Sequence, residues 1–177
     1  MAPTPLDLGA LVRTVPDFPQ PGIAFRDITP LLAHPGALAQ VVEHWTARFG
    51  SAGVERVVAI ESRGFLFGAP LAVALGAGVV PVRKPGKLPA TTLGEDYALE
   101  YGTGRLEMHA DAVTPGQRVL LVDDVLATGG TLAAAAALAR RAGANVIGAA
   151  VLIELGGLGG RARLGDVPVD SLLELAA

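Results

Sequence analysis

The feature that most constrains the fold is an alternation of short β-branched runs with helix-length segments, which begins after residue 54. The runs contain mostly valine, isoleucine, leucine and alanine, as strands buried on both faces of a parallel sheet do. A helix-length apolar segment ending at Leu75 follows the first run, and the alanine-rich Thr131–Arg141 follows the third. The alternation predicts an α/β fold with a mostly parallel central sheet flanked by helices. The expected strands are Arg56–Ile60, Val79–Val82, Arg118–Val122 and Val146–Ile153.

The first 35 residues differ in composition, because they hold seven of the 13 prolines. Only Leu6–Val15 has room there for a short helix, and Pro16–Pro21 is expected to be irregular or extended. Gly36–Phe49 shows the apolar spacing of an amphipathic helix. We therefore expect a single domain over residues 1–177, in which a proline-rich N-terminal segment (1–35) precedes an α/β core (54–155).

The composition of the chain disfavours several classes of binding partner and functional site. The net charge of -3 disfavours a general nucleic-acid binder, which is usually basic. The chain has no cysteine, so thiolate metal sites and a cysteine nucleophile are excluded. It has neither a signal-peptide pattern nor an apolar run long enough to span a membrane, and we expect a cytoplasmic protein.

Two segments interrupt the alternation. Arg83–Tyr97 has no sustained period and contains two prolines and two glycines, which predicts a long mobile loop. Tyr97–Tyr101 and Arg105–His109 flank a Gly-Thr-Gly sequence, which predicts a β-hairpin. The glycine-rich Gly156–Gly160 resembles a phosphate loop but lacks acids at a suitable offset, so we interpret it as a flexible connection.

The strongest functional signal is the sequence VDDVLATGGT, residues 122–131. Asp123 and Asp124 come directly after an expected strand, at the carboxyl edge of the sheet, where ligands bind in open α/β folds. The residues Ala127, Thr128, Gly129, Gly130 and Thr131 then lead into a helix; we call them the phosphate turn. Glycines let successive backbone N–H groups face one point, and the helix start adds partial positive charge. The turn is therefore predicted to cradle a phosphate.

The two acids are suited to what lies beside that phosphate. Carboxylates next to a phosphate repel it unless a hydroxyl-bearing or cationic group lies between them, and a ribose diol or Mg²⁺ fits this position. The simpler alternative is an ordinary strand–turn–helix connection in which Gly129 and Gly130 only permit the bend. The two acids ahead of TGGT favour the ligand site, whereas the dinucleotide and P-loop motifs do not match.

Basic residues occur where a pyrophosphate could be bound. Arg63 follows the first strand at the same sheet edge and could hold an anion with its planar guanidinium, although a surface salt bridge is the alternative. Arg83, Lys84 and Lys87 place three cations in the irregular loop of an otherwise acidic chain. A solvated surface loop is the simpler interpretation of that run, and its position beside the proposed phosphate site favours binding.

The VDDVLATGGT segment resembles the signature of the type I phosphoribosyltransferases, which use phosphoribosyl pyrophosphate (PRPP). Within that group the chain resembles the adenine phosphoribosyltransferases from about residue 7 to its C-terminus. Four further segments carry the resemblance, namely FPQPGIAFRDITP (18–30), ESRGFLFG (61–68), RKPGKLP (83–89) and LEYG (99–102). It implies the type I phosphoribosyltransferase fold, with a small N-terminal hood, a flexible loop and a β-hairpin.

The resemblance also implies a reaction, in which adenine displaces pyrophosphate from PRPP and gives AMP with Mg²⁺ bound alongside PRPP. The loop around Glu61–Ser62 would contain a non-proline cis peptide, and Arg63 with the Arg83–Lys87 loop would hold the pyrophosphate. The hairpin would carry Glu100, which handles a purine proton, and Tyr101 at the PRPP site. Asp123 and Asp124 would complete the catalytic set with Arg63 and Glu100.

For the base, the resemblance places Phe25 and Val125 on the two faces of adenine, with backbone groups near Arg26 reading the ring edge. Leucine is the family residue expected at Val125, and simple core packing is the alternative role for Phe25. A homodimer is implied, with the Arg83 region near the subunit interface. The remaining alternatives are a xanthine- or guanine-type enzyme and a non-catalytic PRPP-sensing regulator; the FRDITP and RKPGKLP segments favour adenine.

Overall fold

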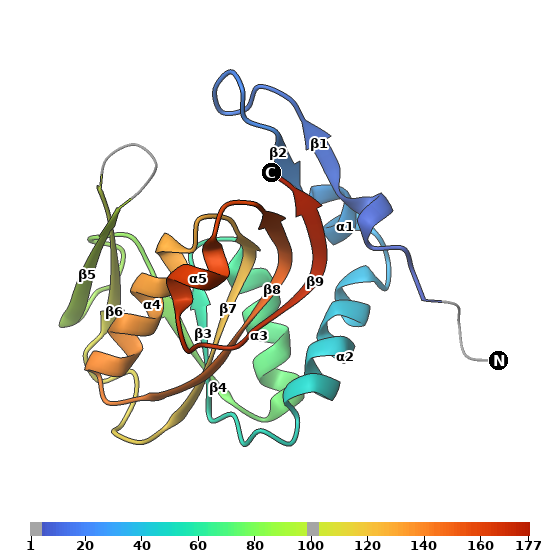
Figure 1. Ribbon diagram of the computed structural model, residues 1–177. Helices are drawn as coiled ribbons and strands as arrows, with labels where there is room; N and C mark the ends of the chain where they lie inside the picture. Colours follow the sequence, from blue (N-terminus) through green and yellow to red (C-terminus); the bar gives the residue numbers. More distant parts are fainter. Residues whose placement is uncertain (1–4, 99–102) are drawn as a thin grey trace.

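The computed structural model describes residues 5–98 and 103–177, and its centre is a five-stranded parallel sheet with strand order β4-β3-β7-β8-β9 (Figure 1). The four expected strands are confirmed. The sheet also contains one strand that the sequence did not predict, β9, which pairs with β8 over Ala149–Gly156. The strands are β3 (Arg56–Ile60), β4 (Gly78–Val82), β7 (Arg118–Leu126), β8 (Asn145–Gly156) and β9 (Val169–Ala176).

Helices cover both faces of this sheet. The helices α2 (Ala37–Phe49) and α3 (Gly64–Leu75) pack on one face and α4 (Gly130–Arg141) on the other, which confirms the α/β expectation (Figure 1). Because successive residues of a strand point to opposite faces, Val57 packs with α2 and α3 whereas Val58 packs with α4. Within the described ranges, no helix is long and apolar enough to cross a membrane.

The N-terminal segment forms a small hairpin beside the sheet rather than a helix. Leu6–Val15 contains only one turn of 3-10 helix, η1 (Gly9–Leu11), before β1 (Arg13–Val15), so the helix expected there was wrong. The β-branched Thr14 and Val15 pair instead with Arg26 and Phe25 of β2 (Phe25–Asp27), and the short helix α1 (Thr29–Ala33) follows. The Pro16–Pro21 connection is irregular, as predicted, and spans the tip of this hairpin. We call this hairpin, residues 13–27 of the N-terminal segment, the hood.

The second hairpin is present, but it is longer than the sequence suggested. Its strands are β5 (Thr92–Ala98) and β6 (Thr103–His109), so the last third of the expected loop Arg83–Tyr97 is a strand. Gly94 obscured this strand in the sequence, yet an added Cβ there would lie 2.1 Å from Nη2 of Arg105, whose side chain crosses the glycine. Thr103 and Gly104, which were expected in the turn, belong instead to β6, where they pair with Ala98 and Tyr97.

Two further boundaries differ from expectation at the carboxyl edge of the sheet. The strand β7 continues to Leu126 because β8, which extends to Gly156, supplies pairing partners for Val125 and Leu126. The end of Gly156–Gly160 is not a flexible connection, because Gly160 is buried and begins the short helix α5 (Gly160–Leu164).

Candidate active site

A cavity of about 500 Å³ opens at the carboxyl edge of the sheet, beside the ends of β3 and β7. Seven of the residues singled out in the sequence line it, which brings together segments that are far apart in the chain. They are Arg63, Lys84, Asp123, Asp124, Val125, Ala127 and Thr131. A larger cavity, of about 880 Å³, lies between the N-terminal segment, α2 and β9, but the described residues that line it include no lysine or arginine.

The acidic pair lies at the base of this cavity on the last part of β7. Asp123 and Asp124 are both buried, at 8% and 3% exposure. Burial, and then the charge of Asp124, raise the pKa of Asp123 well above its ordinary value. Its Oδ1 accepts a hydrogen bond of 2.9 Å from the backbone N–H of Asp124, whereas Oδ2 of Asp124 has no hydrogen-bond partner. That oxygen is instead in ion-pair contact with Arg63, so a ligand hydroxyl or a cation can reach it only where Arg63 gives way.

The phosphate turn forms its own hollow next to the acids. A space of about 70 Å³ is lined only by the consecutive residues 125–132, with the first turn of α4 at its edge. Gly129 caps α4 in the left-handed conformation, with φ of 79°. The curled backbone and the helix start together have the geometry that an anion site requires.

Arg63 connects this edge to the hood. It precedes the first turn of α3, directly after Glu61 and Ser62, whose peptide bond is cis, as the resemblance implied. Its Nε lies in ion-pair contact with Oδ2 of Asp124, without the alignment of a hydrogen bond. Its guanidinium carbon also lies 5.2 Å from the centre of the Phe25 ring. Arg63 is thus part of the site rather than of a separate surface salt bridge.

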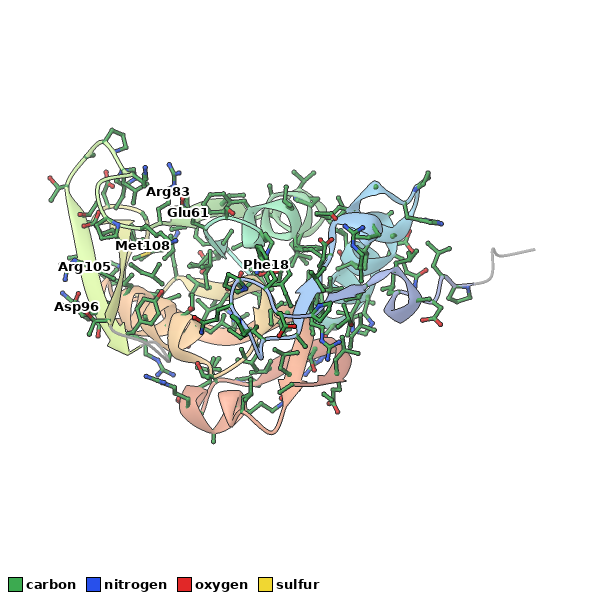
Figure 2. All side chains as sticks on the ribbon, turned by 90° about the horizontal axis from the view of Figure 1, so that it is seen from above. Phe18, Glu61, Arg83, Asp96, Arg105 and Met108 are labelled. Atoms are coloured by element: carbon green, nitrogen blue, oxygen red, sulfur yellow. The ribbon has the colours of Figure 1, made fainter. Side chains whose placement is uncertain are left out.

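Glu61 joins the Arg63 loop to the basic loop. Its carboxylate accepts hydrogen bonds from the backbone N–H of Lys84 (3.0 Å) and from the Arg83 guanidinium (3.3 and 3.4 Å). These contacts, the Lys84 N–H first, lower the pKa of Glu61. Figure 2 shows Glu61 and Arg83 close together, on the side of the molecule that carries the β5–β6 hairpin. Arg83 therefore holds the base of its loop, and Lys84 is the loop cation that lines the cavity.

Arg83 is also fixed to the hairpin. Its backbone N–H donates to the carbonyl of Glu107 (2.9 Å), and the Glu107 N–H donates to the Arg83 carbonyl (2.7 Å). A third contact, from Nη1 to the carbonyl of Lys87 (3.0 Å), closes the start of the loop on itself. The part of the loop next to β4 is consequently joined to the hairpin and to itself by defined hydrogen bonds.

The hood residues lie beside the cavity rather than in its lining. The ring of Phe25 packs edge-to-face on Phe18, with 5.1 Å between centroids, and reaches the site through Arg63. Phe18 is 51% exposed, and Figure 2 shows it on the hood loop above the carboxyl edge of the sheet. The side chain of Arg26 donates to Oγ1 of Thr14 and to the carbonyl of Ala176 (2.6 Å), so it fastens the hood to β9.

Among the remaining predicted residues, Thr128, Gly129 and Gly130 line the smaller hollow, whereas Lys87 lines neither space. Glu100 and Tyr101 lie outside the described residues. The sequence missed Tyr97 and Leu106, which face the cavity from the β5–β6 hairpin. The alternation along β5 could have indicated Tyr97, but the glycine at 94 led us to assign that stretch to a loop.

Comparison with known proteins agrees with this geometry. The phosphoribosyl transferase domain family matches residues 31–172. The adenine phosphoribosyltransferase of Thermobifida fusca is 58% identical over 161 residues, which cover 91% of this chain and 92% of that protein. The crystal structure of the Rhodothermus marinus adenine phosphoribosyltransferase superposes with a TM-score of 0.91 at 56% identity, covering 95% of this chain and 96% of that one. The Saccharomyces cerevisiae enzyme, in complex with an imino-altritol bisphosphate and adenine, has a TM-score of 0.90 at 39% identity, covering 94% and 97%.

Proposed function

Because the chain belongs to the phosphoribosyltransferase family, among the adenine phosphoribosyltransferases, we propose that it makes AMP from adenine and PRPP in purine salvage. The reaction forms a bond between N9 of adenine and C1′ of the ribose and breaks the bond from C1′ to the pyrophosphate oxygen. The observation that carries the proposal is the single cavity in which the phosphate turn, the buried acids, Arg63 and Lys84 meet.

The phosphate turn would hold the 5′-phosphate of PRPP. Its hollow is lined by backbone that is already curled, so little conformational entropy is lost when the phosphate binds. The turn is remote from the bond that breaks, and its binding energy can therefore orient C1′ toward the base. Oδ2 of Asp124, which is buried and contacts Arg63, would accept from a ribose hydroxyl beside that phosphate once Arg63 turns toward the pyrophosphate.

The pyrophosphate would lie over the other side of the cavity. Arg63 and Lys84 line it there, and both can neutralise the charge that develops on the leaving group. Arg83 and Lys87 belong to the same basic loop, and we propose that Lys87 reaches the leaving group when the loop closes and excludes water, while Arg83 holds the base of the loop beside the pyrophosphate. Tyr101 would contribute to the same site.

We propose that Mg²⁺ binds together with PRPP. The donor set fits a magnesium ion, because Asp123 and Asp124 offer carboxylate oxygens and Mg²⁺ is usually held by one or two carboxylates plus substrate phosphates. When bound, the ion would add positive charge beside the pyrophosphate. Arg63 and Lys84 act on the same charge from the protein side.

The purine would stack against Phe25 in the hood. Arg63 covers one face of that ring, and withdrawal of Arg63 toward the pyrophosphate would expose it. Val125, which lines the cavity next to the acids, would cover the opposite face of the base, and backbone groups near Arg26 would read its edge. Adenine loses its N9 proton as the new bond forms, and we assign the acceptor role to Glu100.

We propose a homodimer in which α3 and β4 form the interface. The helix α3 contains no charged residue, and Leu66 and Val73 on it are 46% and 83% exposed. Val79, on the neighbouring edge strand β4, is 44% exposed. Exposed large apolar side chains on a helix without charged residues are typical of a protein interface. For the acidic, cysteine-free chain we propose a cytoplasmic location.

The test is a steady-state assay of purified protein with PRPP, Mg²⁺ and adenine, guanine or xanthine in parallel. We expect AMP from adenine and at least about 100-fold lower kcat/KM with the other purines, since buried polar groups reject a mismatched ring edge. Turnover of guanine or xanthine in place of adenine would overturn the substrate assignment. PRPP binding without turnover of any purine, together with a mobility shift on purine-gene DNA, would identify a regulator instead.

A further inference from the structure

The glycine-rich connection after β8 lies directly under the phosphate turn. Gly160, the first residue of α5, is buried, and Figure 1 shows α5 lying against α4. The backbone of Gly160 is so close to the turn that a Cβ added to Gly129 would lie 2.6 Å from the Gly160 carbonyl oxygen. A Cβ added to Gly160 would lie 2.3 Å from the Ala127 carbonyl oxygen and 2.8 Å from Cδ1 of Leu126. Neither position therefore has room for a side chain.

This contact bears on one particular donor of the turn. The Ala127 carbonyl and the Thr128 N–H belong to the same planar peptide group. A side chain at Gly160 would push on the Ala127 oxygen, and the peptide could yield only by rotating or shifting. The Thr128 N–H would move with it, although no atom of Thr128 is touched. The close packing of Gly160 against Ala127 thereby determines the direction of the Thr128 N–H.

We propose that Gly160 is a positioning residue for the 5′-phosphate, which acts by supporting the Ala127–Thr128 peptide from below. The inference rests on the proposed function, because it takes the ligand of the turn to be the phosphate of PRPP. Gly160 does not touch the ligand itself. Gly157 and Gly159 differ from it, because nothing lies within 4 Å of a Cβ added at either position.

The test compares Gly160→Ala with Gly156→Ala in the full-length protein. Gly156 is in the same segment, is exposed, and would place its Cβ 3.6 Å from the nearest atom, which is ordinary van der Waals contact. For Gly160→Ala we expect kcat/KM for PRPP to fall by about tenfold or more, because a small misplacement of a positioning group has effects of this order. The KM for adenine at saturating PRPP should stay the same. Gly156→Ala should behave as wild type.

Titrations with two separate ligands distinguish positioning from general damage. Ribose 5-phosphate should bind Gly160→Ala about tenfold more weakly, whereas pyrophosphate should bind with unchanged affinity. A merely structural role would lower the amount of active protein and leave both affinities alone. Unchanged binding of ribose 5-phosphate, or an equal loss for pyrophosphate, would overturn the proposal.

A second variant is available if Gly160→Ala does not fold. Leu164, at the far end of α5, is buried in the same core cluster as Leu126, so Leu164→Ala loosens α5 without adding atoms under the turn. Like Gly160→Ala, this variant should lower the affinity for ribose 5-phosphate more than the affinity for pyrophosphate. An equal effect on both affinities would contradict the proposal. Wild-type protein assayed in parallel separates the two ideas: an inactive wild type refutes the adenine reaction, whereas an active wild type with an unaltered variant refutes only the role of Gly160.

Discussion

The guanidinium of Arg63 lies in ion-pair contact with the buried carboxylate of Asp124, and the same guanidinium lies over the ring of Phe25. One side chain therefore touches the residue proposed to hold the ribose and the residue proposed to stack on the base. In the proposed reaction, pyrophosphate would compete with Asp124 for Arg63. The acid would then be available to the ribose and the ring to adenine, which would couple the binding of the three parts of the substrate set.

Replacing Arg63 should lower kcat/KM for PRPP more than replacing any other single basic residue of the site. We expect Arg63→Ala to lower kcat/KM for PRPP by about 100-fold or more, because a charge-assisted contact to the leaving group is lost and Asp124 is left buried without its cation. Arg63→Lys should recover only part of this, since lysine keeps the charge but not the planar fork. Steady-state kinetics with Arg48→Ala, an exposed position on α2, provide the control. Wild-type kinetics for Arg63→Ala would rule out its proposed role.

Removing the charge of Asp124 should weaken the hold on the ribose. Asp124→Asn keeps the shape but offers one acceptor oxygen and no charge, and we expect kcat/KM for PRPP to fall by about 10²-fold. Asp111→Asn, at an exposed position on the turn before β7, should leave the kinetics unchanged. In the absence of adenine, the affinity for pyrophosphate should be unchanged or higher, because Arg63 is released from its ion pair with residue 124. A selective loss of pyrophosphate binding would contradict this assignment.

Asp123 should make the stability of the protein depend on pH. Burial raises its pKa above the ordinary 3.8, so between that value and the raised one the folded protein holds a proton that the unfolded chain has released. The contribution of Asp123 to the free energy of unfolding therefore decreases as pH rises through this window. Asp123→Asn cannot titrate, and its amide oxygen can still accept from the Asp124 N–H.

We consequently expect Asp123→Asn to gain Tm relative to wild type as pH rises from about 4 to about 8, with little difference at the acid end. Carboxylates with lowered pKa values, such as Glu61, change stability in the opposite sense, but they are common to both proteins and cancel in the difference. Thermal denaturation of both proteins across this pH range measures the difference in Tm. A Tm difference that does not vary with pH would show that Asp123 does not titrate in this window.

The hood should determine the affinity for adenine rather than the affinity for PRPP. We expect Phe25→Ala to raise the KM for adenine by about tenfold, since stacking of a base on an aromatic ring contributes on the order of 1–3 kcal/mol, and to change the KM for PRPP far less. Phe18→Leu, which removes the edge-to-face partner of Phe25 without touching the cavity, should give a smaller rise. If PRPP and adenine were affected equally by Phe25→Ala, the ring would be a packing residue only.

A charge on the apolar face of α3 should separate the proposed dimer. Val73 is 83% exposed, so Val73→Glu should not disturb the fold, whereas its burial in an interface would leave an unpaired charge there. Light scattering should show a dimer for wild type and a monomer for Val73→Glu. Ala47→Glu, on the exposed side of α2, is the matched control and should remain dimeric. A monomeric wild type would remove the proposed interface.

The sequence alone determined the features that depend on neighbours in the chain. Runs of β-branched residues predicted β3, β4, β7 and β8 because burial on both faces of a sheet leaves a signature in consecutive residues. The acids and the phosphate turn were recognisable for the same reason, since the strand, the curl and the helix start are continuous in the chain. The resemblance then supplied the reaction and the residues Glu100 and Tyr101, which remain predictions.

Tertiary structure decided what depends on segments that are distant in the sequence. The ion pair of Arg63 with Asp124 joins the ends of β3 and β7, and the close contact of Gly160 with Gly129 joins α5 to the phosphate turn. Gly94 and Gly160 looked like breaks in structure, because a sequence does not show which backbone or side chain occupies the space that the missing Cβ leaves. Packing across the sheet edge fills that space, and it thereby converts a glycine-rich connection into a support for the site.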